Sequence, residues 1–281
     1  MVLLNMFSKR NLFSTTYLNG KRLGSGATSS VFECFNRKTN RKFAVKKIIA
    51  KTVFQYSKME EHHLECLRGH PNICTLHDIF YHDDFDANQQ YVKHIVTDCG
   101  EGDLARLVDT IYMDESTLKI FVEQMLRAIL HCHNNNICHR DIKLENFIYN
   151  NCYNLSPSSA MFPHNTNIKL IDFGFAMKYN KDYNLKGRVG TYSYVAPEIL
   201  CNYTYTPKID SWSLGVCVYK MVIGNPPRTD IKQLTFDPQY NNKQWALYSD
   251  PCRDFVEKLL NIDVNKRISI ADALNHAWIT A

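Results

Sequence analysis

The first hundred residues alternate short apolar stretches with polar or glycine-bearing turns. Five stretches rich in β-branched and aromatic residues predict strands: 17–23, 29–35, 42–49, 73–81 and 91–97. Between the third and fourth strands, 54–68 predicts a helix with Met59, Leu64 and Leu67 on one side. A polar turn is expected at 83–89. This part of the chain therefore reads as a small sheet with one helix.

After residue 100 the apolar positions recur at helical spacing. Four stretches predict helices: 118–133, 211–223, 253–260 and 269–277. The first has an apolar side made of Leu118, Phe121, Val122, Met125, Leu126, Ile129 and Leu130. The second is almost wholly apolar, which indicates a helix buried on all sides. A polar insertion at 151–167 is expected to be a surface loop. Strands followed by helices predict an α+β fold or two lobes.

Composition and charge argue against two classes of protein, namely nucleic-acid-binding proteins and disulfide-rich secreted proteins. The chain has 281 residues, of which 45% are apolar, and a net charge of +5. A charge this mild does not predict nucleic-acid binding, and the densest basic run, at 37–42, is expected to be a solvated hairpin turn. The 10 cysteines are scattered and form no C-x-x-C pair. They are expected to be free thiols in a reducing compartment.

No stretch predicts a membrane span or a signal peptide. The expectation is a soluble protein of the cytoplasm, the nucleus or both, without membrane insertion. Because the chain ends at Ala281, soon after the last predicted helix, no regulatory tail is expected.

Two features of the strand-rich part suggest phosphate chemistry. The first is a glycine-bearing turn of nine residues: Leu23, Gly24, Ser25, Gly26, Ala27, Thr28, Ser29, Ser30 and Val31. Glycine allows a backbone to approach a phosphate closely, although a plain hairpin explains this turn equally well. The second is Lys46, which lies in the apolar strand Phe43-Ala44-Val45-Lys46 and, if buried, needs an anionic partner. A strand-end lysine that reaches solvent is the alternative.

The helix-rich part carries a denser group of polar residues. It consists of His139-Arg140-Asp141-Ile142-Lys143-Leu144-Glu145-Asn146, directly after the long amphipathic helix. About thirty residues later, the apolar stretch Lys169-Leu170-Ile171 ends in Asp172-Phe173-Gly174. Carboxylate and amide oxygens are hard ligands that suit Mg²⁺. This group has the residue types needed to bind a hydroxyl, a phosphate and a divalent cation.

Taken in order, these motifs resemble the serine/threonine type of the eukaryotic protein kinase family. The resemblance runs from about Tyr17 to Trp278, and also includes G-T-Y-S-Y-V-A-P-E at 190–198 and D-S-W-S-L-G at 210–215. The last stretches look closest to the calmodulin-dependent and AMP-activated-like group. The resemblance implies a bilobal α+β kinase domain over 17–281. Its small five-stranded β lobe with one helix would span 17–99, and its larger helical lobe 100–281. Residues 1–16 would form a short extension.

The resemblance also assigns site residues. It implies that Asp141 accepts the proton of the substrate hydroxyl, that Lys143 contacts the γ-phosphate, and that Asn146 and Asp172 bind Mg²⁺. The residues implied for ATP are the turn 23–31, Ala44, Lys46, Glu60, Asp98, Asp103 and Ile148. Glu60 is chosen over Glu61 as the partner of Lys46. The implied activity is transfer of the γ-phosphoryl group from ATP to serine or threonine hydroxyls of protein substrates, by an enzyme expected to be monomeric.

Other matches to the family are structural. The resemblance implies that Glu198 pairs with Arg267 and that Asp210 braces the backbone around Asp141. Thr97 would precede the hinge that links the lobes. The choice of serine or threonine rests on Lys143 and on Thr191, which are expected to share hydrogen bonds with Asp141.

Three alternatives remain. The first is a pseudokinase that binds nucleotides or serves as a scaffold, supported by Ser29, which stands where the family pattern has a third glycine. The second is a zinc site, because His131-Cys132-His133 and Cys138-His139 lie close together in sequence. The third concerns regulation. No serine or threonine lies between Asp172 and Thr191, so we hypothesise that activity does not require threonine phosphorylation in this segment.

Overall fold

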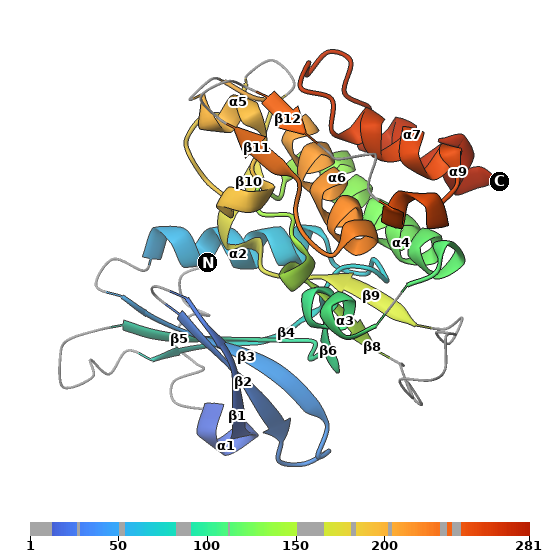
Figure 1. Ribbon diagram of the computed structural model, residues 1–281. Coiled ribbons are helices and arrows are strands. Elements are labelled where there is room, and N and C mark those ends of the chain that lie inside the picture. Colours follow the sequence, from blue (N-terminus) through green and yellow to red (C-terminus); the bar gives the residue numbers. More distant parts are fainter. Residues whose placement is uncertain are drawn as a thin grey trace. The chain divides into compact units, whose positions relative to one another are not determined.

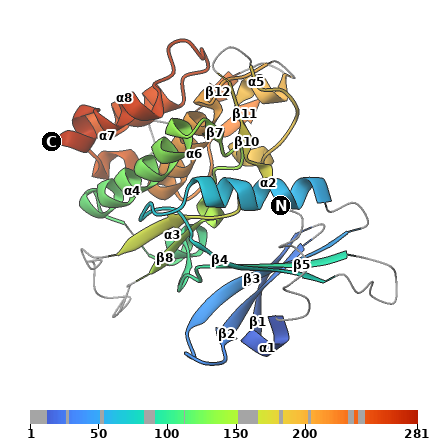
Figure 2. The ribbon, with the colours of Figure 1, turned by 180° about the vertical axis from the view of Figure 1, so that it is seen from behind.

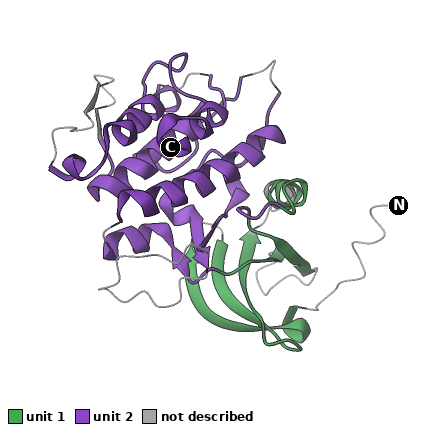
Figure 3. Cartoon of the chain, turned by 90° about the vertical axis from the view of Figure 1, so that its right-hand side faces the viewer, with its two compact units in different colours: residues 1–69, 74–99 green, residues 70–73, 100–281 purple. Residues whose placement is uncertain are grey.

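The computed structural model describes residues 13–26, 29–50, 54–82, 91–111, 113–150, 166–180, 184–201, 204–230, 235–237 and 243–281. The chain divides into two compact units: residues 1–69 with 74–99, and residues 70–73 with 100–281 (Figure 3). Ala27, Thr28, the expected turn at 83–89 and nearly all of the expected loop at 151–167 lie outside the described residues. Within the described part of the chain, no helix is long and apolar enough to cross a membrane.

The first unit is a sheet with one long helix (Figure 1). Its elements are α1 (Phe13–Thr16), β1 (Tyr17–Ser25), β2 (Ser29–Asn36), β3 (Lys42–Ala50), α2 (Phe54–Cys66), β4 (Leu76–His82) and β5 (Tyr91–Thr97). The strands are antiparallel neighbours in the order β1-β2-β3-β5-β4. Phe13 of α1 is buried and stacks on Tyr17, so the core of this unit includes residues that precede the first strand.

Two expectations for the first unit are corrected. Met59 does not share the buried side of α2, because 41% of its side chain is exposed. From residue 59 onward, the buried positions are instead Glu60, Glu61, His63 and Leu64 of α2 and, just beyond its end, Leu67. The fourth strand begins at Leu76 rather than at residue 73, because Ile73 belongs to the second unit and forms a parallel bridge with Leu170.

The second unit is mainly helical, and Figure 2 shows its long helices α4 and α6 side by side. Its α-helices are α3 (Leu104–Thr110), α4 (Glu115–Asn134), α5 (Pro197–Leu200), α6 (Lys208–Ile223), α7 (Asp250–Leu259), α8 (Ile270–Leu274) and α9 (Ala277–Thr280). Its strands are β6 (Gly102–Asp103), β7 (Ile137–Cys138), β8 (Phe147–Asn150), β9 (Asn167–Leu170), β10 (Met177–Lys178), β11 (Arg228–Asp230) and β12 (Thr235–Asp237). Short 3₁₀ turns are η2 (Leu144–Asn146), η3 (Phe173–Phe175), η4 (Tyr192–Tyr194) and η5 (Lys243–Leu247).

The central helices confirm the expectation of a buried pair. Every residue of α6 is buried except Lys208 and Lys220. The apolar side predicted for α4 is buried as well, apart from Leu130, which is only half-buried. Burial of this much apolar side chain is the main favourable term in the stability of the unit. The expected α+β architecture is therefore confirmed.

One expected helix is in fact two. The stretch 269–277 forms α8, which ends at Leu274 with Asn275 as its C-cap, and then the start of α9, for which His276 is the N-cap. Its Nδ1 accepts a hydrogen bond from the backbone N–H of Trp278 at 3.2 Å, and its Nε2 lies 2.9 Å from an Asp254 oxygen. A side chain that satisfies a free backbone donor at this point favours a new helix start over continuation.

Candidate active site

The first unit contributes an ion pair between β3 and α2. The Nζ atom of Lys46 lies 3.0 Å from both carboxylate oxygens of Glu60. Glu60 is buried and the Lys46 side chain is only 19% exposed. Of the two glutamates considered from the sequence, Glu60 is therefore the partner of Lys46. The ion pair holds the lysine nitrogen at this face of the sheet.

The glycine-bearing turn is a hairpin whose strands pair almost to its tip. Gly24 lies opposite Val31, Ser25 lies opposite Ser30, and the backbone N–H of Gly26 donates to the Ser29 carbonyl at 2.8 Å. A Cβ atom on Gly24 would meet nothing within 4 Å, so this glycine leaves open space beside the backbone. A hairpin and a phosphate-covering loop are compatible descriptions of this geometry.

Other residues predicted for ATP also have defined partners. Ala44 lies opposite Thr97, the last residue of β5. The Asp98 carboxylate accepts the backbone N–H of Thr75 at 2.9 Å and contacts His77 Nε2 at 2.7 Å. The Asp98 side chain is thus already occupied, so any contact of this residue with adenine would come from its backbone.

In the second unit, Asp103 lies opposite Ile148 in the β6–β8 register. The Asp103 carboxylate also caps α3 by accepting the backbone N–H of Arg106 at 3.0 Å. The structure thus brings together two of the residues predicted for nucleotide binding, and the cap fixes the direction of one of them.

In the second unit, the segment 139–146 contains a compact group around Asp141, which is buried. Its Oδ1 accepts the Thr191 hydroxyl at 2.7 Å. Its Oδ2 lies 2.9 Å from Lys143 Nζ and 3.2 Å from Asn146 Nδ2. Lys143 Nζ also donates to the Thr191 hydroxyl at 2.8 Å. The hydrogen bonds expected among Asp141, Lys143 and Thr191 are therefore present.

Asn146 and Asp172 are brought together by paired strands. Asn146 directly precedes β8, Asp172 follows β9 by two residues, and the backbone N–H of Ile171 donates to the Asn146 carbonyl at 2.9 Å. The Asn146 amide nitrogen donates to Asp141, which leaves its amide oxygen directed elsewhere. A carboxylate and an amide oxygen at adjoining strand ends fit a Mg²⁺ ion by ligand chemistry.

Two residues of this region have left-handed backbones. Arg140 has φ of 68° and Asp172 has φ of 60°, a conformation that costs a non-glycine residue energy and is found mainly at functional sites. Asp210 stabilises the first of them. Its oxygens accept the backbone N–H groups of His139 and Arg140, both at 3.0 Å. The expectation that Asp210 braces this backbone is confirmed.

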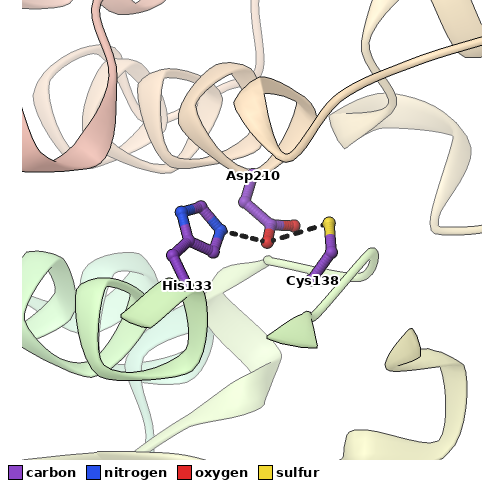
Figure 4. Close-up of side chains that lie close together, drawn as sticks. All are labelled: His133, Cys138 and Asp210. Atoms are coloured by element: carbon purple, nitrogen blue, oxygen red, sulfur yellow. Dashed lines mark hydrogen bonds and ion pairs between the residues drawn. The ribbon is translucent and has the colours of Figure 1, made fainter. Parts of the chain in front are cut away.

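Asp210 is also the centre of a polar cluster with half-buried His133 and buried Cys138 (Figure 4). His133 Nε2 lies 2.9 Å from Asp210 Oδ2, and the Cys138 thiol donates to the same oxygen at 3.3 Å. Burial by itself would raise the pKa of Asp210, but the hydrogen bond and charge of His133, together with the backbone donors, bring that pKa below its ordinary value.

This cluster contains two of the residues considered for a zinc site, His133 and Cys138, but its third member is Asp210. Burial and the nearby Asp210 charge raise the pKa of Cys138 well above its ordinary value, which keeps a neutral thiol, whereas zinc binds the thiolate. The other two histidines point elsewhere. His131 stacks on His70 at 4.6 Å, and His139 Nε2 contacts the Ile171 carbonyl. The cluster therefore reads as a hydrogen-bonded brace.

A second buried ion pair links distant segments of this unit. Arg267 binds both oxygens of Glu198, at 2.6 and 3.0 Å, and its guanidinium lies 5.0 Å from the ring of Trp212. This is the pair expected from the sequence. By contrast, the contacts of His133 with Asp210 and of Tyr205 with Arg140 were not predicted from the sequence. The partners lie 77 and 65 positions apart, and no local pattern links them.

Comparisons with known proteins show the family of this chain. A family model described as the protein kinase domain matches residues 17–279. The chain is 31% identical to the calcium/calmodulin-dependent protein kinase type II alpha chain of Drosophila melanogaster, over 95% of this chain and 50% of the relative. It is 31% identical to calcium/calmodulin-dependent protein kinase type IV of Rattus norvegicus, over 97% and 56%. It is 30% identical to the serine/threonine-protein kinase ULK3 of Homo sapiens, over 92% and 54%.

The chain belongs to the protein kinase family, among the eukaryotic-type serine/threonine kinases. It spans about half the length of the curated relatives it matches. Members of this family use ATP and divalent metal ions.

Proposed function

We propose that this protein transfers the γ-phosphoryl group of ATP to serine or threonine hydroxyls of protein substrates. The hydroxyl oxygen forms a bond to the γ-phosphorus, the bond from that phosphorus to the β,γ-bridging oxygen breaks, and ADP leaves. The hydroxyl proton passes to Asp141. Lys143 faces the negative charge on the transferred group, which it stabilises in the transition state.

One observation carries this proposal: the hydrogen-bonded triangle of Asp141, Lys143 and Thr191. Each carboxylate oxygen has two lone pairs, and Thr191 uses one of those on Oδ1. The remaining lone pair is available to a substrate hydroxyl. Because Thr191 and Lys143 fix the carboxylate, it does not need to reorient during reaction. The presence of both residues supports serine and threonine as acceptors.

We propose that Lys46 binds the α- and β-phosphates and that the turn 23–31 covers them. Glu60 orients Lys46, and Ala44, Asp98, Asp103 and Ile148 complete the nucleotide site. Asn146 and Asp172 bind Mg²⁺, which when bound neutralises charge on the phosphates. The support is the Lys46–Glu60 ion pair and the adjoining placement of Asn146 and Asp172.

The test is transfer of radiolabelled phosphate from ATP to a generic protein, followed by identification of the labelled amino acid. The expected label is phosphoserine or phosphothreonine, with transfer lost in Asp141→Asn and in Lys46→Met. Preference for tyrosine would contradict the proposed acceptor. Nucleotide binding without transfer by the wild type would instead support a nucleotide-binding scaffold.

We further propose that the activation segment, 172–198, needs no threonine phosphate. Arg140, the residue that would contact such a phosphate, donates from Nε to the Phe175 carbonyl at 2.7 Å and from Nη1 to the Tyr205 hydroxyl at 3.3 Å. Tyr205 is buried, and its hydroxyl lies 3.0 Å from the carbonyls of Lys186 and Gly187. Neutral acceptors thus take two of the five N–H donors of the guanidinium and connect it to the segment.

Phosphatase treatment tests this point. Treated and untreated enzyme are expected to transfer phosphate at the same rate, with mass spectrometry used to map any phosphate on residues 172–198. A loss of activity that tracks removal of phosphate from this segment would refute the proposal.

A further inference from the structure

A second buried ion pair lies beside the Lys46–Glu60 pair, on the same helix. Glu61 of α2 pairs with Lys93 of β5. Both side chains are nearly inaccessible, with Glu61 at 7% and Lys93 at 2% relative exposure. The proposed phosphoryl transfer assigns no role to either residue. Burying a lysine and a glutamate costs free energy unless the two groups pair with each other. A pair buried between α2 and β5 therefore calls for an explanation.

Tyr81 of β4 joins this pair. Its hydroxyl donates to Glu61 Oε2 at 2.8 Å, and its ring lies 5.1 Å from Lys93 Nζ. Tyr81 and Lys93 are direct partners in the β4–β5 register, so their side chains leave the same face of the sheet. Burial and the charge of Glu65 raise the pKa of Tyr81, which keeps its hydroxyl protonated as a donor. Glu61, Lys93 and Tyr81 form what we call the α2 anchor.

The sheet register places the α2 anchor on the same face as Lys46. Lys46 lies opposite Ile95, and Ile48 lies opposite Lys93. Residues two apart in a strand share a face, so Lys46 and Lys93 project from one face as diagonal neighbours. Both lysines meet α2, one at Glu60 and the other at Glu61.

Consecutive residues of an α-helix point about 100° apart around its axis. One ion pair leaves a helix free to roll about that contact, whereas two pairs at consecutive positions, each to a different strand, define its rotation. From residue 59 onward, α2 supplies one buried apolar side chain, Leu64, with Leu67 just beyond its end, and Met59 is exposed.

We propose that Glu61, Lys93 and Tyr81 are positioning residues that fix the rotation of α2 and thereby keep Glu60 paired with Lys46. This inference rests on the proposed role of Lys46 in binding ATP phosphates. In this arrangement α2 is locked to the sheet by the chain itself, without a phosphate or a partner.

The test compares three variants of the full chain: Glu61→Gln, Lys93→Met and the matched control Glu65→Gln. The control removes the same charge from an exposed position of the same helix, one turn away. We measure the KM and kcat for ATP, the Kd of a non-hydrolysable ATP analogue, and amide hydrogen exchange of α2. Loss of the anchor is expected to raise KM and Kd about tenfold, within the range typical of coupling between sites, and to speed exchange in α2. The control is expected to match the wild type.

Two further variants separate positioning from a general structural role. In a Glu60→Gln background, Glu61→Gln is expected to add no further loss of analogue affinity, because the pair it positions is already broken. The charge-exchanged variant Glu61→Lys with Lys93→Glu is expected to restore part of the affinity. If Lys93→Met fails to fold, Lys93→Arg replaces it. This variant preserves the charge and changes only the geometry of the pair with Glu61.

Two results would overturn the proposal. One is a lower melting temperature in Glu61→Gln with unchanged analogue affinity and α2 exchange. The other is fully additive losses in the Glu60→Gln background. A wild type that binds the analogue but transfers no phosphate would contradict the proposed kinase activity and leave the binding and exchange readouts valid, so the two failures are distinguishable.

Discussion

Two of the buried pairs between a glutamate and a basic residue, Arg267–Glu198 and Lys46–Glu60, are built differently. Arg267 and Glu198 form a bidentate pair in which the arginine side chain is 0% exposed. The arginine also donates to the carbonyls of Asn261 and Lys208. Lys46 of β3 and Glu60 of α2 form a pair in which the lysine side chain is 19% exposed.

The difference suggests that the Arg267–Glu198 pair serves the stability of the fold, and we call it the scaffold pair. The Lys46–Glu60 pair is the one proposed to act in nucleotide binding, and we call it the working pair. Arginine matches a carboxylate with two parallel bonds and has further donors to satisfy neighbouring carbonyls. Lysine is a compact charge with three donors that can be shared with a second anion. The Arg267 pair is therefore suited to permanent packing, and the Lys46 pair is suited to exchanging contacts with a phosphate.

The largest effect is expected from breaking the scaffold pair. Arg267→Met leaves Glu198 buried and uncompensated, which is expected to lower the free energy of unfolding by about 3–5 kcal/mol. Urea denaturation followed by circular dichroism measures this. Arg267→Lys is expected to lose less, because it retains one charge-assisted bond. A loss below about 1 kcal/mol, the value of an exposed pair, would contradict the comparison.

Breaking the working pair is expected to change activity more than stability. Lys46→Met is expected to slow phosphoryl transfer at least about 100-fold, the effect of removing one transition-state donor. Its cost in unfolding free energy is expected to be smaller than that of Arg267→Met, about 1–3 kcal/mol, because the Lys46 side of the pair is 19% exposed whereas Arg267 is fully buried. Single-turnover kinetics and urea denaturation of the same preparation test both parts. Equal stability losses for the two variants would erase the distinction.

The Asp210 brace is expected to give an acid-dependent contribution to stability. Its pKa is lower in the folded protein than in the unfolded chain, where it is about 3.9. Its stabilising contribution is therefore fully present above that value and is lost as the pH falls through the folded pKa. Asp114, Glu115 and Asp254 also have lowered pKa values and titrate in the same direction.

The Asp210 contribution is isolated by difference. At pH 7, Asp210→Asn is expected to cost about 2 kcal/mol, and the gap to wild type is expected to narrow below pH 4. Urea midpoints measured at pH 7, 5 and 3 give the gap. A gap that widens on acidification would show that the sign of the pKa shift is wrong.

The smallest effect is expected from an exposed pair. Glu123 and Arg127 lie one turn apart on α4 with an oxygen–nitrogen distance of 2.7 Å, and their side chains are 37% and 57% exposed. Arg127→Gln is expected to change the unfolding free energy by less than about 0.5 kcal/mol. A larger loss would mean that exposure does not set the value of ion pairs in this protein.

Much of the fold was predictable because its signals are local. The five strands of the first unit follow from short stretches of β-branched and aromatic residues, and α4 and α6 follow from their apolar spacing. Boundaries were less predictable. Ile73 reads as part of a strand, yet it contacts Leu170 far along the chain, and His276 divides an expected helix by capping a new one.

The sequence by itself determined which residues we propose for the site: Lys46, Asp141, Asn146 and Asp172 follow from motifs in the order of the protein kinase family. Tertiary structure decided what each of these residues contacts. Glu60 and Glu61 are adjacent and equally acidic, and only the sheet register assigns the first to Lys46 and the second to Lys93. In the same way, folding brings Tyr205 to Arg140 and His133 to Asp210. The type of each residue can be taken directly from the sequence, but a contact between distant residues depends on how the chain between them folds.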